Sequence, residues 1–455
     1  MAKYYRPKSI DDMVHYDMHR KPQRQWRILS VVTWLGSFIP FWLAGGKVKR
    51  TNMEGLKPPY LLLGNHNAFT DFQDATVGIF PHRANYIVSI DVYPALGWVL
   101  EPLGGIATRK FTTDTTLVKS MMRCIKNGDI VIMYPEARYS FAGTPCVLPP
   151  SVGKLAKLLK VPVVTLVAHG NHIGQPLWNL RQRGWKKPQF EIKQLLTAEQ
   201  VKEYSVDDIN QALRDEFDYN DYEWQLQHKI KCTKKWRAEG LHKILYQCPH
   251  CKTEFEMSSK GHELTCNACG KVWDMSIYGQ LKAVRIGDTD LSGDESATEF
   301  TKIPDWFEWE RSNVHEEVMS GRYCSKGRVR VDDCPSKKGY VRMGEGDFVH
   351  DYTGFHVNFS GPYGDFEFHN EVADNFTCHI EYNFHKTGLD AISLSSLTDT
   401  YFLYSLTKEL CPAKVYFATE ELYFNYFKHA GTINGKPISP HVRDNMTHPK
   451  TEFGF

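Results

Sequence analysis

Residues 61–71 read LLLGNHNAFTD, an apolar run that ends at Gly64 and leads to His66 and, five positions later, to Asp71. The apolar run predicts a short buried strand, because turn-forming residues bound it on both sides. The four residues that begin at Thr70 match a capping box, so a helix is expected to start with Thr70 as its N-cap. His66 would then lie in the strand-to-helix turn and Asp71 in the first helical turn.

This placement allows a general base with an orienting partner. From a turn, the His66 imidazole can fold back over the helix start and meet the Asp71 carboxylate. A carboxylate on one ring nitrogen fixes the tautomer and leaves the other nitrogen free to accept a proton. We therefore predict that His66 and Asp71 are catalytic. The alternative is a polar turn with a helix-capping carboxylate.

The His66-x4-Asp71 pattern and three later stretches resemble the glycerolipid acyltransferases, the family of lysophosphatidic acid and glycerol-phosphate acyltransferases. The later stretches are residues 105–109 (GIATR), 134–140 (YPEARYS) and 161–165 (VPVVT), which follow in the family's order. Four blocks in order are far more specific than one short motif. The resemblance covers roughly residues 50 to 215 and implies an α/β acyltransferase domain at 51–217.

By this resemblance the chain moves a fatty acyl group from an acyl thioester, acyl-CoA or acyl-ACP, to a hydroxyl of a lysophospholipid such as 1-acylglycerol-3-phosphate. His66 would take the hydroxyl proton while Asp71 orients the imidazole. No serine or cysteine lies within the His66 motif, which favours direct transfer over an acyl-enzyme. The implied substrate-binding residues are Asn65, Gly105, Thr108, Arg109, Glu136, Arg138 and Ser140. Among them, Arg109 and the block around Glu136 would hold the glycerol-phosphate part.

The third block departs from the family pattern. Ala137 replaces a glycine, Arg138 stands at the position of a threonine, and Tyr139 stands at the position of an arginine. Either Arg138 does the work of that arginine from one residue earlier, or the acceptor differs. The alternatives are therefore a non-phosphate acceptor, a sugar or amino-acid lipid, and, from another class, a non-catalytic lipid-binding module.

Residues 1–50 are predicted to form a membrane-anchoring segment. Ile28 to Gly46 contains no charge in 19 residues, and basic residues flank it on both sides. Pro40 interrupts this run, and the two basic flanks give no orientation by the positive-inside rule. The pattern fits a monotopic or re-entrant segment on the cytoplasmic face, with membrane lipids as partners. A spanning helix and a buried helix are the alternatives, and no cleavable signal peptide is expected.

Residues 51–217 alternate apolar runs with helical patterns, which is typical of an α/β domain with a mixed, largely parallel sheet. The expected strands are 60–63, 86–89, 130–134 and 161–167, and the expected helices are 71–80, 113–126 and 153–160. His66 and Glu136 would then lie at the carboxyl ends of strands, where active-site residues of such sheets gather.

A four-cysteine metal site is predicted at 246–280, after a charged, helical linker at 218–245. Two Cys-x-x-Cys pairs, Cys248/Cys251 and Cys266/Cys269, are separated by fourteen residues, which is the signature of a zinc ribbon. Four thiolates leave no open position on the metal, so the zinc is expected to be structural. The alternative is two redox or disulfide pairs. The ribbon carries as much acid as base, so no nucleic-acid partner is expected.

Residues 285–430 are predicted to form a β-rich domain of short strands followed by a helix at 414–428, and residues 431–455 a loose tail. By pattern the β-rich domain resembles a pleckstrin-homology or GRAM-like barrel.

Composition adds two constraints. The formal net charge is +2, which gives no global attraction to nucleic acid or membrane, and an odd count of 11 cysteines favours a reducing compartment. Residues 176–190 combine tryptophan, arginine and lysine with no acid. They are expected to form either a membrane-surface or phosphate-facing loop, or a solvated loop with inward tryptophans.

Overall fold

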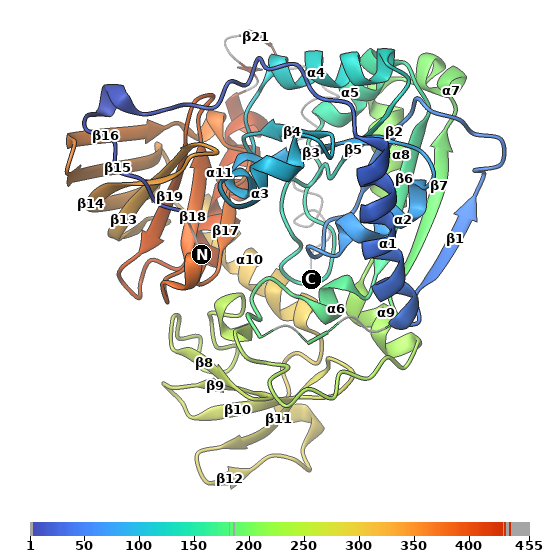
Figure 1. The fold of residues 1–455 in the computed structure, drawn as a ribbon. Coiled ribbons are helices and arrows are strands. Elements are labelled where there is room, and N and C mark those ends of the chain that lie inside the picture. The colour runs from blue at the N-terminus through green and yellow to red at the C-terminus, as the bar shows by residue number, and fades with distance from the viewer. Residues whose placement is uncertain (1–2, 182, 185–186, 431, 434–435, 438–455) are drawn as a thin grey trace.

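The computed structural model describes residues 3–181, 183–184, 187–430, 432–433 and 436–437 (Figure 1). It consists of an α/β unit, a small ribbon and a C-terminal antiparallel sheet with two long helices. The predicted loose tail at 431–455 lies outside the described residues, apart from two dipeptide strands, β20 (Thr432–Ile433) and β21 (Lys436–Pro437).

The α/β unit is built on a seven-stranded sheet whose central strand carries the motif of residues 61–71. In spatial order its strands are β1 (Lys47–Thr51), β7 (Gln189–Leu196), β6 (Val163–His169), β2 (Leu61–Gly64), β5 (Ile130–Met133), β3 (Ala84–Ser89) and β4 (Gly105–Thr108). Every neighbouring pair is parallel except β6 and β7. The mixed, largely parallel sheet is therefore confirmed, with β2 fully buried between β6 and β5.

Helices cover both faces of this sheet. They are α1 (Arg27–Leu43), α2 (Asp71–Ile79), α3 (Tyr93–Leu100), α4 (Thr115–Lys126), α5 (Ser151–Leu159), α6 (Asn171–Gly174), α7 (Ala198–Glu203), α8 (Val206–Glu216) and α9 (Asp221–Gln227). One core cluster joins the sheet to α4, α5 and α8, and another joins it to α1 and α2. None of the helices that the structure describes is both long enough and apolar enough to cross a membrane.

The predicted strands and helices of this unit are confirmed to within two residues at most ends. The sequence patterns missed β1, β4 and β7. Strand β1 reads KVKRT, and its lysines and arginine suit an exposed sheet edge rather than a buried strand.

The ribbon follows α9. Its five antiparallel strands are β8 (Met257–Lys260), β9 (Glu263–Cys266), β10 (Lys271–Met275), β11 (Leu281–Ile286) and β12 (Thr289–Asp290). The segment 218–245, predicted as a helical linker, contains α9 and a short 3₁₀ turn at Leu241–Lys243, with coil and turns over 228–240.

The C-terminal unit contains one antiparallel sheet of seven strands. In spatial order they are β16 (Gly364–Asn370), β15 (Gly354–Gly361), β14 (Gly339–Asp351), β13 (Ser325–Ser336), β19 (Thr400–Ser405), β18 (Ala391–Ser395) and β17 (His379–Glu381). Helices α10 (Ile303–Met319) and α11 (Pro412–Ala430) pack on each other beside it. The β-rich region is therefore confirmed. A closed pleckstrin-homology or GRAM-like barrel is not shown, because within the described sheet β16 and β17 each pair on one side only.

The three units share buried contacts rather than lying apart. One continuous core cluster includes Phe141 and Trp178 of the α/β unit, Leu264 of the ribbon, and Val329 and Phe348 of the C-terminal sheet. The domain boundaries stay predictions, because this core runs across the borders that the sequence suggests.

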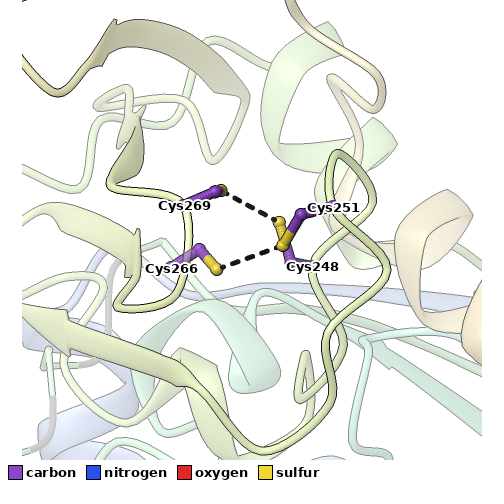
Figure 2. A group of neighbouring side chains, drawn as sticks. All are labelled: Cys248, Cys251, Cys266 and Cys269. Carbon is purple, nitrogen blue, oxygen red and sulfur yellow. Dashed lines mark hydrogen bonds between the residues drawn. The ribbon is translucent and has the colours of Figure 1, made fainter.

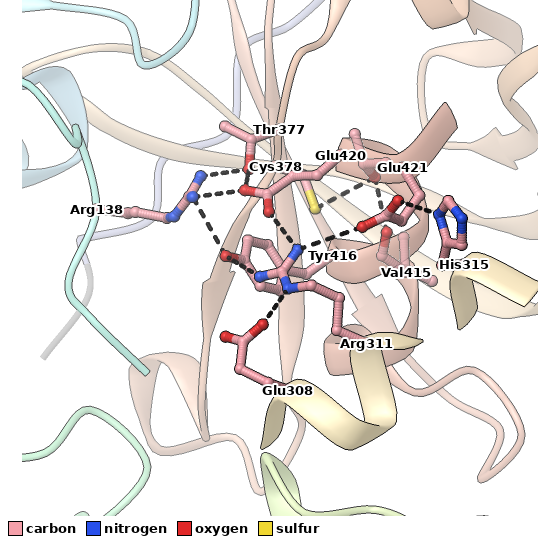
Figure 3. Close-up of polar contacts among 11 residues, drawn as sticks. Arg138, Glu308, Arg311, His315, Thr377, Cys378, Val415, Tyr416, Glu420 and Glu421 are labelled. Carbon is pink, nitrogen blue, oxygen red and sulfur yellow. Dashed lines mark hydrogen bonds and ion pairs between the residues drawn. The ribbon is translucent and has the colours of Figure 1, made fainter. Parts of the chain in front are cut away.

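A buried ionic network connects the α/β unit to both long helices (Figure 3). Arg138 pairs with Glu420 of α11 at 2.5 Å, and Glu420 pairs with Arg311 of α10 at 2.7 Å. The Tyr416 hydroxyl lies 3.2 Å from both guanidinium groups. A buried charge is costly unless it is paired, so this network fixes the loop that carries Arg138 against α10 and α11.

Candidate active site and metal centre

His66 and Asp71 meet in the turn between β2 and α2. His66 Nδ1 lies 2.9 Å from Asp71 Oδ2, so the ring nitrogen that remains for a substrate is Nε2. The His66 side chain is 20% exposed, while that of Asp71 is fully buried. Asp71 is shielded from water, whereas the His66 imidazole is partly accessible. The carboxylate therefore orients the imidazole, and Nε2 can meet a ligand.

The Asp71 carboxylate accepts hydrogen bonds from groups that follow two neighbouring strands, β2 and β6. Its Oδ2 also accepts the backbone amides of Asn67 at 2.6 Å and Ala68 at 2.9 Å. Its Oδ1 accepts the Asn171 side chain at 2.7 Å, and Asn171 donates as well to Asp74 at 2.6 Å. Burial raises the pKa of Asp74 well above its ordinary value, which favours the neutral form of that carboxyl.

This arrangement corrects the expected capping box. Thr70 is the N-cap residue of α2, but its side chain makes no capping hydrogen bond. Asp71 takes over the polar role by turning its carboxylate back to the amides of the preceding turn. Asn171, in contrast, had no sequence signal, because it lies a hundred residues from Asp71 on the short helix after β6.

Two tyrosines of the third block hold the His66 ring. The rings of Tyr134 and Tyr139 each have their centroid 4.3 Å from that of His66. Gly64 permits the approach of Tyr134, since a Cβ at residue 64 would come within 2.7 Å of that ring. Tyr139 therefore contributes to the site from the position where the family pattern has arginine.

Glu136 and Ser140 bind the backbone around His66. Glu136 is buried and accepts the amides of His66 at 3.2 Å and Cys146 at 3.0 Å. Burial raises the pKa of its carboxyl to about 7. The Ser140 amide donates to the His66 carbonyl at 2.8 Å, and its hydroxyl donates to the Thr144 carbonyl. These contacts position the histidine, and a direct contact of either side chain with substrate stays a prediction.

The two arginines expected to hold a phosphate are bonded to the C-terminal unit. Arg109 is 2% exposed and donates to the carbonyls of Cys334 and Pro335 and to the Thr400 hydroxyl, at 2.8–3.1 Å. Arg138 is paired with Glu420, as described above. In this arrangement a phosphate could engage either guanidinium only by competing with these bonds.

The remaining predicted binding residues lie as follows. Asn65 is buried. Its side-chain amide donates to the Ala168 carbonyl and accepts from the Ala168 backbone amide, so it extends the pairing of β2 with β6. Gly105 lines the cavity described next, and a Cβ there would come within 2.8 Å of the Leu100 carbonyl. Thr108 ends β4, with its hydroxyl 3.5 Å from the Arg109 carbonyl.

A cavity of about 360 Å³ opens beside His66. Apolar side chains of the α/β unit form most of its wall, among them Phe72, Val88, Leu96 and Leu103. Its size and apolar lining are those of a small-molecule site with a few polar groups.

The polar groups of the cavity come from both units. Lys110 lies 3.3 Å from Asp91 and 3.9 Å from Glu381 of β17, and His379 lies 2.8 Å from Glu381. The C-terminal sheet therefore contributes to the wall of the cavity that His66 also lines. The sequence could not indicate this, because β17 is three residues long and lay in no predicted strand.

The four predicted metal ligands converge (Figure 2). The sulfur atoms of Cys248, Cys251, Cys266 and Cys269 all lie within 4.8 Å of one another, with pairs at 3.7 and 3.8 Å. Sulfurs bound to zinc at about 2.3 Å in a tetrahedron are about 3.8 Å apart, whereas a disulfide bond is about 2.05 Å long. The cluster therefore fits a metal ion, and zinc is the ion that such a site prefers. None of the 11 cysteines, all of which lie in the described part of the chain, forms a disulfide bond.

No protein-family model matches the chain, and no curated protein matches it. Among solved structures, the chain is similar to the 1-acyl-sn-glycerophosphate (LPA) acyltransferase PlsC from Thermotoga maritima. The two are 15% identical, the match covers 42% of this chain and 81% of that chain, and the TM-score is 0.33. Because this similarity is weak, the function proposed below is based on the geometry of the site.

The metal centre gives a first testable prediction. The purified protein should contain about one zinc per chain, and Cys266→Ser should release it, because three thiolates hold zinc less tightly than four. Elemental analysis measures the zinc, and Cys324→Ser, which changes an exposed cysteine outside the cluster, serves as the control. Folded wild-type protein without zinc or another thiophilic metal would contradict the assignment.

Proposed function

We propose that the chain is an O-acyltransferase that moves a fatty acyl group from an acyl thioester, acyl-CoA or acyl-ACP, to a hydroxyl of a lysophospholipid such as 1-acylglycerol-3-phosphate. The observation that carries the proposal is an oriented histidine, with Nδ1 on a buried carboxylate, at an apolar cavity. An apolar cavity suits a fatty chain, and a free imidazole nitrogen suits the removal of a hydroxyl proton.

The proposed step is direct transfer. The acceptor oxygen attacks the thioester carbonyl as its proton passes to His66 Nε2, the carbon–sulfur bond breaks, and the departing thiolate takes that proton from the imidazolium, which restores neutral His66. Asp71 stabilises the imidazolium that forms. The nearest candidate nucleophiles around Glu136 are unsuited to an acyl-enzyme. Burial raises the pKa of the Cys146 thiol to about 12, and the Ser140 hydroxyl donates to a backbone carbonyl.

The acceptor would lie against the polar groups of the cavity. Lys110 lines the cavity and is the residue next to the arginine of the second block, and its ion pairs there, at 3.3 Å to Asp91 and 3.9 Å to Glu381, are longer than that of Arg138 with Glu420. A phosphate on the acceptor could bind this ammonium. The second candidate acceptor, a sugar or amino-acid lipid, is favoured by Asp91 and Glu381, whose carboxylates can accept from hydroxyl or ammonium groups.

The same proposal places the protein at the cytoplasmic face of a membrane. Helix α1 exposes a series of large apolar side chains: Ile28, Val31, Val32, Leu35, Ile39, Trp42 and Leu43. Phe69 and Leu96, which line the cavity, are also exposed. Exposed apolar patches of this kind, next to the basic strand β1, fit the insertion of one helix face among lipid headgroups.

Catalysis is tested first by the release of free thiol from acyl-CoA in the presence of a lysophospholipid. His66→Ala should lower turnover by about 100-fold or more, since a positioned general base contributes at least that much. Asp71→Asn should also be severely impaired, because the amide cannot stabilise the imidazolium. His82→Ala, which changes an exposed histidine three residues after α2, is the matched control. Near-normal turnover in purified His66→Ala would contradict the role of His66 as general base.

The acceptor is tested by comparing two neighbouring cations. Lys110→Ala should raise the apparent KM for a phosphate-bearing lysolipid by about tenfold or more and leave that for the acyl thioester nearly unchanged. Arg109→Ala should instead lower the free energy of unfolding by about 1–3 kcal/mol, because it leaves buried carbonyls unpaired. The resemblance implies the opposite assignment, with the KM effect on Arg109. No effect of either variant on KM would favour the acceptor without phosphate.

Membrane binding is tested by sedimentation with phospholipid vesicles. Ile28→Glu combined with Trp42→Glu should shift the protein to the supernatant, because both side chains are more than 60% exposed and would carry charge into the lipid layer. Leu397→Glu places a glutamate at an apolar residue that is 60% exposed in the turn between β18 and β19, and it should sediment like the wild type. Equal sedimentation of all three proteins would show that α1 does not anchor the chain.

A further inference from the structure

A second cavity lies away from the His66 site, where the loop after α6 meets the segment that leads from α9 to the ribbon. Its volume is about 60 Å³, and it is lined by Arg183 and Gly184 on one side and by residues 230–234 on the other. The loop belongs to the stretch 176–190, which contains tryptophan, arginine and lysine but no acid. The reaction proposed for His66 does not use this cavity.

Arg183 is the unusual feature of this cavity. Its side chain is 1% exposed, yet none of its three guanidinium nitrogens has a hydrogen-bond partner among the described residues. The Arg183 amide donates to the Gly174 carbonyl at 2.8 Å, and its guanidinium carbon lies 4.9 Å from the centroid of the Trp178 ring. The backbone and an aromatic face therefore hold the arginine in place, while its donors remain unused.

A buried guanidinium without an anion is energetically unfavourable, because burial removes water and nothing replaces it. Within the part of the chain that the structure describes, no carboxylate lies within ion-pair distance of Arg183. Two further cations line the same cavity, the exposed Lys231 and the half-buried Lys234, and neither of them forms an ion pair with a described residue. Three positive charges thus surround a space without a compensating negative charge.

The other titratable groups near Arg183 do not supply that charge. Burial, together with the charge of Arg183, lowers the pKa of His172 to about 3, and burial raises the pKa of Tyr222 to about 12, so both are neutral. Asp221 directs its carboxylate to the amides of Gly170 and His172 and toward His169. The two ring nitrogens of His172 and the Tyr222 hydroxyl also lack partners among the described residues.

We infer that this cavity is a binding site for a phosphate-type oxyanion, held by Arg183 at its base and by Lys231 and Lys234 at its rim. A cavity needs about 10–15 Å³ to hold one water, so this one has room for about four groups of that size, as in a tetrahedral oxyanion. The planar guanidinium donates two parallel hydrogen bonds to such an anion, and the lysines add charge without fixing geometry.

The inference is tested with inorganic phosphate by titration calorimetry and by thermal unfolding of the full chain. The wild type should bind one phosphate per chain, and its Tm should rise with phosphate concentration until the site is saturated. Arg183→Gln should weaken this binding by about 30-fold or more. Arg181→Gln is the matched control, because Arg181 lies in the same loop but is exposed and paired with Glu239. It should bind phosphate like the wild type.

A further variant guards against misfolding. Arg183→Met, which fills the site with an apolar side chain, should raise Tm in the absence of phosphate and abolish the phosphate-dependent rise. If the variants of Arg183 do not fold, Lys231→Gln combined with Lys234→Gln changes only rim residues and should weaken phosphate binding by about tenfold. Absence of phosphate binding to the wild type, or unchanged affinity in the variant that folds, would overturn the inference.

The source of the anion is decided by two phosphate esters tested in the same way. Glycerol 3-phosphate represents a lipid headgroup, and coenzyme A, compared with its 3′-dephospho form, represents the acyl carrier. If the binding of one ester depends on Arg183 and is at least about tenfold tighter than that of inorganic phosphate, the ligand belongs to the class which that ester represents. Esters that bind no more tightly than phosphate identify the free anion. Because these measurements do not involve turnover, their outcome does not depend on whether His66 is catalytic.

Discussion

The candidate active site depends on the buried carboxylate of Asp71. A carboxylate without water must be satisfied by protein donors, and Asp71 accepts four, from His66, Asn67, Ala68 and Asn171. The turn after β2 provides three of them, and the short helix after β6 provides the fourth. Since β2 and β6 are adjacent parallel strands, their carboxyl ends bring these donors to one point. The sheet is thus what holds the histidine in its orientation.

The C-terminal unit is part of the same site and not an appendage. Arg109 and Arg138, the arginines of the second and third blocks, bond to β13, β19 and α11. His379 and Glu381 of β17 line the cavity together with residues of the α/β unit. Buried ion pairs contribute little net stability but penalise every arrangement in which they separate. The pair of Arg138 with Glu420 therefore serves to hold one relative position of the two units, and Arg311 of α10 fixes the same Glu420 within the C-terminal unit (Figure 3).

Much of this could be predicted wherever the cause is local in sequence. The apolar runs predicted β2, β5 and β6, and the spacing of His66 and Asp71 predicted that they meet. The cysteine spacing predicted the cluster of four thiols. The predictions that failed were those that depend on contacts between residues far apart in the sequence. A block pattern gives the position of Arg109 along the chain, but the direction of its side chain depends on a sheet that starts more than two hundred residues later. Asn171, Glu381 and Arg183 have meaning only through such contacts, so no local pattern could select them.

Direct acyl transfer assisted by His66 can be observed in a single-turnover experiment. Excess enzyme is mixed with acyl-CoA labelled in the acyl chain and with a lysophospholipid, quenched, and separated into protein, lipid and free fatty acid. With direct transfer, one labelled acyl chain should appear on the lipid for each coenzyme A released, with no label on the protein at any time. Label on the protein, or its release as free fatty acid, would contradict it.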